Sequence, residues 1–226
     1  MVEVDFLLIE RSIKKDKRYD VKVWSGGKPK LPKLGMEKIR REAMIEATII
    51  EIGEAGSLNV PVSQIARRAG ISPALAHHYF GSKEQIFLAA MRHILVIFKE
   101  SVSQRLRHAR TPEERIRAII AASLERRQFD RDVVSAWLSF YVKSLHSEET
   151  SRLLRVYARR LHSNLLFDLR KLFEDETAEK VAQGLASMID GFYIRHALQD
   201  IAPPRADVHA LVEDYLDLWL FREAEH

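Results

Sequence analysis

The chain has 226 residues, of which 46% are hydrophobic and 30% are charged, so it can bury the core of one large domain or two small ones. It contains no cysteine, which excludes a disulfide framework and a thiolate zinc site and suits the reducing cytoplasm. Charges interrupt its apolar runs before the ~20 residues that a membrane span requires. The formal net charge of +4 permits nucleic-acid binding. Because the chain has neither cysteine nor a long apolar run, we expect a cytoplasmic protein without a membrane partner.

Residues 1–31 form an extension that differs from the rest of the chain. Residues 2–10 have the pattern of a short strand, and a basic stretch with two glycines follows. The composition of this stretch predicts a disordered tail or linker. One hypothesis is that the extension is a real basic arm that reaches the minor groove of DNA.

The stretch from Met36 to Ala55 predicts a long amphipathic helix. Its apolar residues recur at helical spacing along one stripe, and these are Met44, Ile45, Ile49 and Ile52. Gly56 follows and ends the helix.

Residues 62–83 indicate two short helices joined by a tight turn. Gly70 supplies the left-handed backbone that ends the first helix, Ser72 caps the second, and Pro73 fits its first turn. From Pro61 to Lys83 there is no Asp or Glu, as expected of a surface that faces phosphates. We interpret the stretch as a helix-turn-helix whose second helix enters the major groove, the alternative being an ordinary helical hairpin.

The rest of the chain predicts further helices and no strand, so the expected fold class is all-α. Thr111, Pro112 and the two glutamates after them form a clear helix start. The expected helices cover residues 83–109, 112–128, 131–145, 147–173, 178–198 and 206–221. We expect the helix over 131–145 to be buried nearly all round, because most of its residues are apolar.

Several motifs carry a resemblance to a known family. IARRAGIS at 65–72 and HHYFGSKEQIF at 77–87 resemble the TetR family of transcriptional repressors. PKLGM at 32–36, AWLSF at 136–140, SNLL at 163–166 and IDGFYIR at 189–195 resemble its BetI type, the choline-responsive repressors of glycine betaine synthesis. The resemblance implies a three-helix helix-turn-helix DNA-binding domain at 32–82 and a helical ligand-binding and dimerisation domain at 83–226.

The resemblance also bears on the extension. Proteins of this type begin near PKLGM, and Leu31 stands where their first methionine would be. We therefore favour the hypothesis that translation starts at Leu31 from a leucine codon, which would make residues 1–31 a start-site artefact.

By position within the resemblance, residues of the second short helix and its flanks contact operator DNA. Those expected at base edges are Pro73, Ala74, Leu75 and His77, and those expected at phosphates are Arg67, Ser72, His78, Tyr79 and Lys83. A metal shared by His77 and His78 is disfavoured, because neighbouring helical residues point about 100° apart. Where the family usually has a threonine cap, this chain has Pro61.

The carboxy-terminal helices are rich in aromatic residues, and we expect an effector site there. A quaternary ammonium such as that of choline donates no hydrogen bond, so it is bound by aromatic faces and a carboxylate. The candidate residues are Trp137, Phe140, Tyr141, Phe167, Asp190 and Tyr193. The BetI type has tryptophan where Tyr193 stands, so the alternative is a different small effector, such as a drug, a fatty acid or a purine derivative. Asp190 has the alternative role of a helix-packing contact.

The last two helices are expected to form a homodimer, because Leu211, Tyr215, Leu218 and Trp219 make an apolar stripe that needs a partner. We expect effector binding to shift the two DNA-binding domains between arrangements that do and do not fit the operator. The sequence contains no glycine-rich phosphate loop, nucleophile elbow or spaced metal ligands. We therefore expect no enzymatic activity, no metal and no cofactor.

Overall fold

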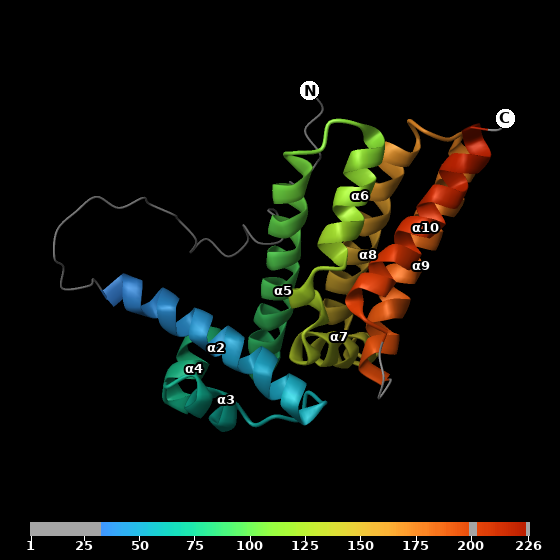
Figure 1. Ribbon diagram of the computed structural model, residues 1–226. Coiled ribbons are helices and arrows are strands. Elements are labelled where there is room, and N and C mark those ends of the chain that lie inside the picture. The colour runs from blue at the N-terminus through green and yellow to red at the C-terminus, as the bar shows by residue number, and fades with distance from the viewer. Residues whose placement is uncertain (1–32, 199–202, 225–226) are drawn as a thin grey trace. The chain divides into compact units, whose positions relative to one another are not determined.

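The computed structural model describes residues 33–198 and 203–224, and the expectations for the extension 1–31 lie outside these residues. The chain divides into two units, 1–36 and 37–226. In the first unit, the described residues 33–36 begin a helix that continues into the second unit. Over the described residues the chain has α-helices, one 3-10 helix and no strand, which confirms the all-α fold class (Figure 1).

The helices agree closely with the expected ranges except in one region. Their bounds are α2 (Lys33–Ala55), α3 (Val62–Arg68), α4 (Pro73–Phe80), α5 (Lys83–Leu106), α6 (Pro112–Ser123), η1 (Arg126–Phe129), α7 (Arg131–Ser144), α8 (Glu148–Leu169), α9 (Asp175–Leu198) and α10 (Arg205–Ala224). In the described part of the chain, no helix is long and apolar enough to cross a membrane.

The exception is the end of α6, which we expected to continue to Gln128. The helix ends at Ser123, because Leu124 adopts φ −100° and ψ 20°, and the 3-10 helix η1 follows. Gln128 and Phe129 are nevertheless buried, so burial continues beyond the end of the α-helix. Periodicity alone did not distinguish a longer α-helix from an α-helix followed by a 3-10 helix.

The turn between α3 and α4 has the local structure that the sequence predicts. Gly70 has φ +67°, and the N–H of Ile71 donates to the carbonyl of Ala66 at 3.0 Å, which closes the end of α3. The Ser72 hydroxyl accepts from the N–H of Leu75 at 3.2 Å and caps α4. Pro61 begins α3 without a side-chain cap.

Helix α2 holds α3 through a buried carboxylate. Glu51 is 3% exposed and accepts from Arg68 Nε at 2.5 Å and from the Gln64 amide. Burial raises the pKa of Glu51, but the hydrogen bonds from Arg68 and Gln64 outweigh this and hold the pKa below its usual value. Arg68 also binds Glu54, so its guanidinium is engaged within the protein.

The same helix holds α4 through Arg41. Its guanidinium lies 4.5 Å from the centre of the Phe80 ring and donates to the carbonyl of Tyr79 near the end of α4. Both short helices are therefore attached to α2 by charged side chains that face inward.

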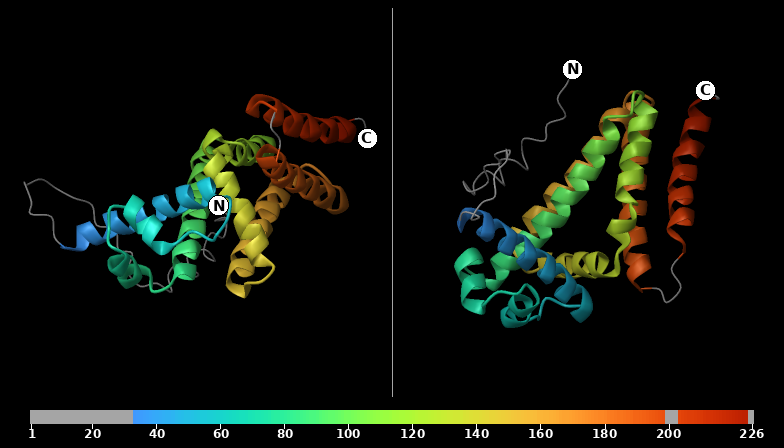
Figure 2. Two further views of the ribbon diagram at one scale, coloured as in Figure 1. Left: turned by 90° about the horizontal axis from the view of Figure 1, so that it is seen from below. Right: turned by 60° about the vertical axis from the view of Figure 1, so that its left-hand side comes forward.

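The remaining helices pack into a bundle with a shared core. Helix α6 packs against α5, α8 and α10, while α9 packs against α7, α8 and α10. Helix α7 contacts α5, α8 and α9 and lies across the lower ends of the long helices in Figure 1 (Figures 1 and 2). The expectation that α7 is buried all round is wrong at its end, because Val142 and Leu145 are 64% and 77% exposed.

A buried ion pair joins α6 to α8 inside this bundle. Asp168 is 1% exposed and accepts from Arg115 Nε at 2.9 Å and from Lys171 Nζ at 2.6 Å. By contrast, the pair between Arg92 and Glu149 spans 3.3 Å with both side chains at least one third exposed.

We predict that Asp168→Asn lowers the free energy of unfolding by about 2–3 kcal/mol, because Arg115 loses its charged partner inside the bundle. Glu149→Gln serves as the control and should cost less than about 1 kcal/mol, because solvent screens that pair. Urea unfolding of the two variants measures both values. Equal losses would show that burial of the Asp168 pair does not matter.

Candidate DNA-binding and effector sites

The expected DNA-contacting residues lie at the surface of the segment from α3 to the start of α5. The exposed ones are Arg67, Ser72, Pro73, Ala74, His77 and His78, and the half-buried ones are Leu75, Tyr79 and Lys83. None is fully buried, so the structure leaves each able to meet a partner. Unlike Arg68, Arg67 forms no ion pair within the described part of the chain.

Contacts within this segment orient several of its polar side chains. His77 Nδ1 lies 3.3 Å from the carbonyl oxygen of Gly81, and the His78 ring packs beside Tyr79 with centroids 5.7 Å apart. Lys83 Nζ lies 5.3 Å from the centre of the Phe87 ring. The segment thus presents hydroxyl, imidazole and ammonium groups from one short helix and its flanks.

A second group of residues forms an aromatic cluster between α7, α8 and α9. The ring of Trp137 lies 5.1 Å from Tyr157 and 6.0 Å from Tyr141, and Tyr157 meets Phe98 edge-on at 5.8 Å. Trp137 and Tyr157 are 7% and 8% exposed. Below, the aromatic cage means Trp137, Tyr141 and Tyr157 together with Asp190.

Asp190 supplies the carboxylate of the aromatic cage. Its Oδ1 lies 3.4 Å from the Tyr157 hydroxyl, which donates to it, and the Tyr141 hydroxyl is a second donor. Burial raises the pKa of Asp190 to about 6, although the two tyrosine hydrogen bonds lower it. Burial also raises the pKa of Tyr141 and Tyr157 well above the usual range, so both hydroxyls stay protonated near neutral pH.

Asp190 is half-buried and differs from the two buried acids, Glu51 and Asp168, in having no cationic side chain as a partner. Glu51 binds an arginine, and Asp168 binds an arginine and a lysine. Within the described residues, no ion pair involves Asp190. A cation placed against this carboxylate and the surrounding rings would supply the missing charge.

Of the six residues expected in the effector site, the structure brings four together. Trp137, Tyr141 and Asp190 belong to the cage, and Tyr193 lies at its edge. The Tyr193 ring packs 5.0 Å from Phe129, and its hydroxyl donates to the carbonyl of Ser123.

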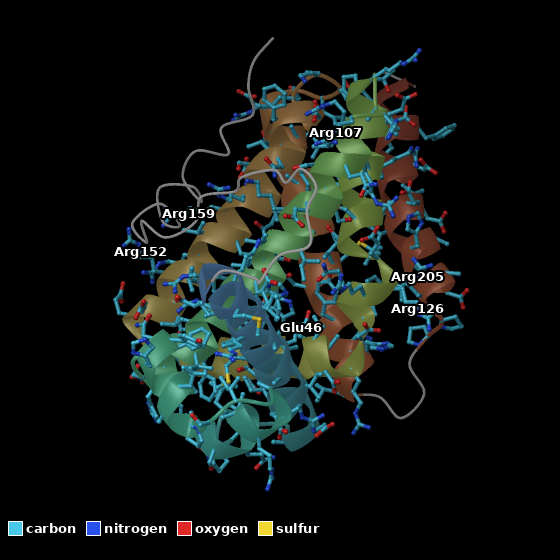
Figure 3. The ribbon with its side chains drawn as sticks, turned by 90° about the vertical axis from the view of Figure 1, so that its left-hand side faces the viewer. Glu46, Arg107, Arg126, Arg152, Arg159 and Arg205 are labelled. Carbon is cyan, nitrogen blue, oxygen red and sulfur yellow. The ribbon has the colours of Figure 1, made fainter. Side chains whose placement is uncertain are left out.

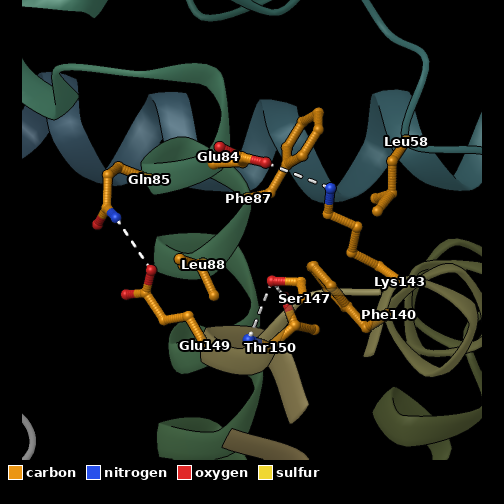
Figure 4. A pocket seen from close by; sticks show the side chains of 10 residues that line it. All are labelled: Leu58, Glu84, Gln85, Phe87, Leu88, Phe140, Lys143, Ser147, Glu149 and Thr150. Carbon is orange, nitrogen blue, oxygen red and sulfur yellow. Dashed lines mark hydrogen bonds and ion pairs between the residues drawn. The ribbon is translucent and has the colours of Figure 1, made fainter. Parts of the chain in front are cut away.

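The structure places Phe140 and Phe167 elsewhere. Phe140 is 1% exposed and lines a cavity of about 140 Å³ between α5, α7 and α8 (Figure 4). Phe167 is 40% exposed, with Lys171 Nζ 3.9 Å from its ring centre. Periodicity did not reveal which face of its helix each aromatic occupies.

Tyr157, whose ring lies nearest to Trp137, was not among the residues expected from the sequence. Tyr157 lies between arginines at 155, 159 and 160, which hide it in a charged stretch. Its spacing from Leu153, Leu154 and Leu161 could have revealed that Tyr157 is buried, because these leucines form a buried stripe on α8 that includes Tyr157.

Besides the cavity beside Phe140, a larger one of about 350 Å³ lies between α2, α5, η1 and the start of α7. Cage residues line neither of the two. Within the described residues, no group of three His, Asp or Glu side chains is placed to hold a metal ion.

Helices α9 and α10 expose an apolar face. On α10, Val208, Val212 and Leu216 are buried, whereas Leu211 and Leu218 are 49% and 63% exposed. Trp219 is half-buried and packs beside Tyr215, with ring centres 6.4 Å apart. Further large apolar side chains exposed on these helices are Ile194, Leu198 and Phe221.

Comparisons with known proteins identify the family of the chain. The family model described as "Bacterial regulatory proteins, tetR family" matches residues 44–90, and the model "BetI-type transcriptional repressor, C-terminal" matches residues 112–220. The HTH-type transcriptional regulator BetI of Brucella anthropi is 52% identical over 193 residues, covering 85% of this chain and 100% of that protein. Its counterpart in Agrobacterium fabrum is 47% identical, covering 84% of this chain and 92% of that protein.

Among solved structures, a transcriptional regulator from Saccharomonospora viridis in complex with choline has the same fold. Its TM-score is 0.71 at 23% sequence identity, and the match covers 78% of this chain and 95% of that one.

The curated relatives are transcriptional regulators, which confirms the expectation that the chain is not an enzyme. Regulators of the TetR family bind operator DNA and small-molecule effectors and work as dimers. Because the chain is about half identical to BetI regulators over their whole length and matches both family models, it belongs to the BetI-type transcriptional repressors of the TetR family.

Proposed function

We propose that this repressor controls genes of glycine betaine synthesis in the cytoplasm, with choline as the effector that alters its binding to the operator. Residues 32–82 form the proposed DNA-binding domain, and residues 83–226 form the proposed ligand-binding and dimerisation domain. The single observation that supports the choice of effector is the aromatic cage. In it, Tyr141 and Tyr157 bind a half-buried carboxylate that has no cationic partner within the described residues, and Trp137 packs beside both tyrosine rings.

The chemistry of the cage suits a quaternary ammonium. Such a cation is attracted by aromatic faces, at about 0.5–2 kcal/mol per face, and needs no hydrogen-bond acceptor of defined direction. Asp190 adds the opposite charge, and the hydroxyls of Tyr141 and Tyr157 hold the carboxylate in place. The choline complex of the Saccharomonospora viridis regulator supports this proposal by similarity of fold.

Helix α4 is the proposed recognition helix. Ala74 and Leu75 are suited to thymine methyl groups, and His77 to a hydrogen bond with a base edge. Arg67 and Lys83 supply positive charge for phosphates on either side of the helix. The exposed face of α9 and α10 is the proposed dimer interface, and a twofold dimer would place two copies of α4 in successive major grooves of a palindromic operator.

Ligand and DNA would be coupled through a shift between two arrangements of the dimer. Choline relieves repression only as far as it binds one arrangement more tightly than the other. Helix α5 begins at Lys83 beside α4 and carries Phe98 into contact with Tyr157, so it connects the two proposed sites within one helix.

We predict that Lys83→Ala weakens operator binding and reduces the slope of log K against log salt by about one, because one phosphate contact is lost. Arg107→Ala is the control with the same change in charge, since Arg107 is exposed at the other end of α5 (Figure 3). Fluorescence anisotropy on the DNA upstream of the protein's own gene measures both slopes. An unchanged slope for Lys83→Ala would place Lys83 outside the interface.

We predict that Tyr157→Ala and Asp190→Asn weaken choline binding about tenfold or more, because each removes an aromatic face or the opposing charge. Phe167→Ala is the matched control on α8, since this exposed ring lies outside the cage. Calorimetric titration of the full chain measures the affinities. The neutral isostere 3,3-dimethyl-1-butanol should bind far more weakly than choline, and binding that ignores the cage variants would favour a different effector.

We predict that choline affinity falls as pH falls through about 6. Choline keeps its charge at every pH, whereas Asp190, with a pKa of about 6, loses its charge on protonation. Affinity at pH 5 should therefore be about tenfold lower than at pH 8. Asp190→Asn should bind choline weakly at both pH values, and a pH dependence that survives this substitution would identify another group.

A further inference from the structure

The cavity of about 350 Å³ between α2, α5, η1 and the start of α7 has a chemistry of its own. Its apolar wall comes from two helices and consists mainly of Ile49, Ile50, Ile94 and Ile97. Apart from the imidazole of His93, no aromatic ring lines it, so it lacks the faces that a quaternary ammonium needs.

The charged groups at this cavity are mostly acidic. Carboxylates of Glu46, Asp130 and Asp132 face one guanidinium, that of Arg127 (Glu46 is labelled on α2 in Figure 3). In the described part of the chain, no ion pair engages these four side chains. Burial lowers the pKa of His93, so this imidazole adds no positive charge near neutral pH.

One polar side chain of the cavity is free to bind a ligand there. Gln128 lines the cavity and is 4% exposed, and within the described residues nothing forms a hydrogen bond to its side-chain amide. The amide atoms themselves are accessible from the cavity. A ligand with a hydrogen-bonding head would bond to the amide at this point.

The walls of the cavity belong to helices that meet in direct contact. A Cβ added at Gly53 of α2 would lie 2.4 Å from the Cα of Asp132, so the backbones of α2 and α7 approach closely beside the cavity. Helix α2 holds α3 and α4, while α7 carries Trp137 and Tyr141. A molecule in the cavity would therefore touch α2, which holds the two short helices, and α7, which carries two residues of the cage.

We propose that this cavity is a second small-molecule site, which binds a protonated alkylamine and is coupled to DNA binding. The carboxylates accept hydrogen bonds from the ammonium N–H groups, Gln128 accepts a further one, and the isoleucines cover the alkyl chain. The N–H donors distinguish this ligand class from the quaternary ammonium proposed for the cage.

The test is a calorimetric titration of the full chain with n-hexylamine at pH 7.5, where the amine is protonated. Saturable binding is expected in the wild type, and Glu46→Gln should weaken it about three- to fivefold, as expected for a partly exposed charge. Glu42→Gln is the matched control one turn earlier on α2, where the carboxylate pairs with Lys38 instead. n-Hexanol, which has the chain without the charge, should bind more weakly than n-hexylamine.

A second variant tests the site in a protein that is expected to stay folded. Gln128→Leu removes the buried amide and fills its space with an apolar group, so the protein should keep its stability in urea while n-hexylamine binding falls at least tenfold. Asp190→Asn should leave n-hexylamine binding unchanged while it weakens choline binding. In the wild type, n-hexylamine should also shift operator affinity at least twofold.

Two results would overturn the proposal: no saturable n-hexylamine binding to the wild type, or binding that Asp190→Asn abolishes and Glu46→Gln does not change. Either result would leave the assignment of choline to the cage intact, because that assignment is tested by choline and the cage variants alone.

Discussion

The close contact between Gly53 and Asp132 constrains how the DNA-binding helices connect to the rest of the protein. Only glycine permits this separation, because any side chain at position 53 would meet the backbone of α7. On the α2 side, Arg41 and Glu51 fasten α4 and α3, so these short helices follow α2 when it moves. On the α7 side, Trp137 lies little more than a turn further along the helix. A ligand that displaces α7 would therefore act on the DNA-binding surface through the direct contact between α7 and α2.

Three acids removed at least partly from solvent show how differently one chemical group is used in this protein. Glu51 and Asp168 each bind cationic side chains and join one helix to another. Asp190 is held only by tyrosine hydroxyls, and burial raises its pKa to about 6. Two of these carboxylates are thus structural, whereas the third keeps a charge that a ligand can complement. The contrast rests on the partners of each acid, because the two more deeply buried acids are the ones with cationic partners.

Local signals in the sequence predicted the helices and the turn of the DNA-binding segment well. Gly70, Ser72 and Thr111 act within a few residues of themselves, so their effects are readable from the chain alone. The effector site depended on which helix faces meet across long separations. Tyr157 was missed because its partner Trp137 lies on another helix. Phe167 was included although its ring is exposed and packs with Lys171 on its own part of the chain. The early end of α6 was missed because the 3-10 helix that follows also buries side chains, those of Gln128 and Phe129.

The division of the cage among α7, α8 and α9 has a consequence for how such regulators diverge after gene duplication. Substitutions at Tyr157 and Asp190 change the proposed effector site from helices that do not carry the Gly53 contact. Substitutions at Trp137 or Tyr141 alter the same helix that touches α2. We therefore expect new effector preferences to arise first from substitutions on α8 and α9. Such substitutions change which effector the daughter protein binds and leave its response to DNA intact.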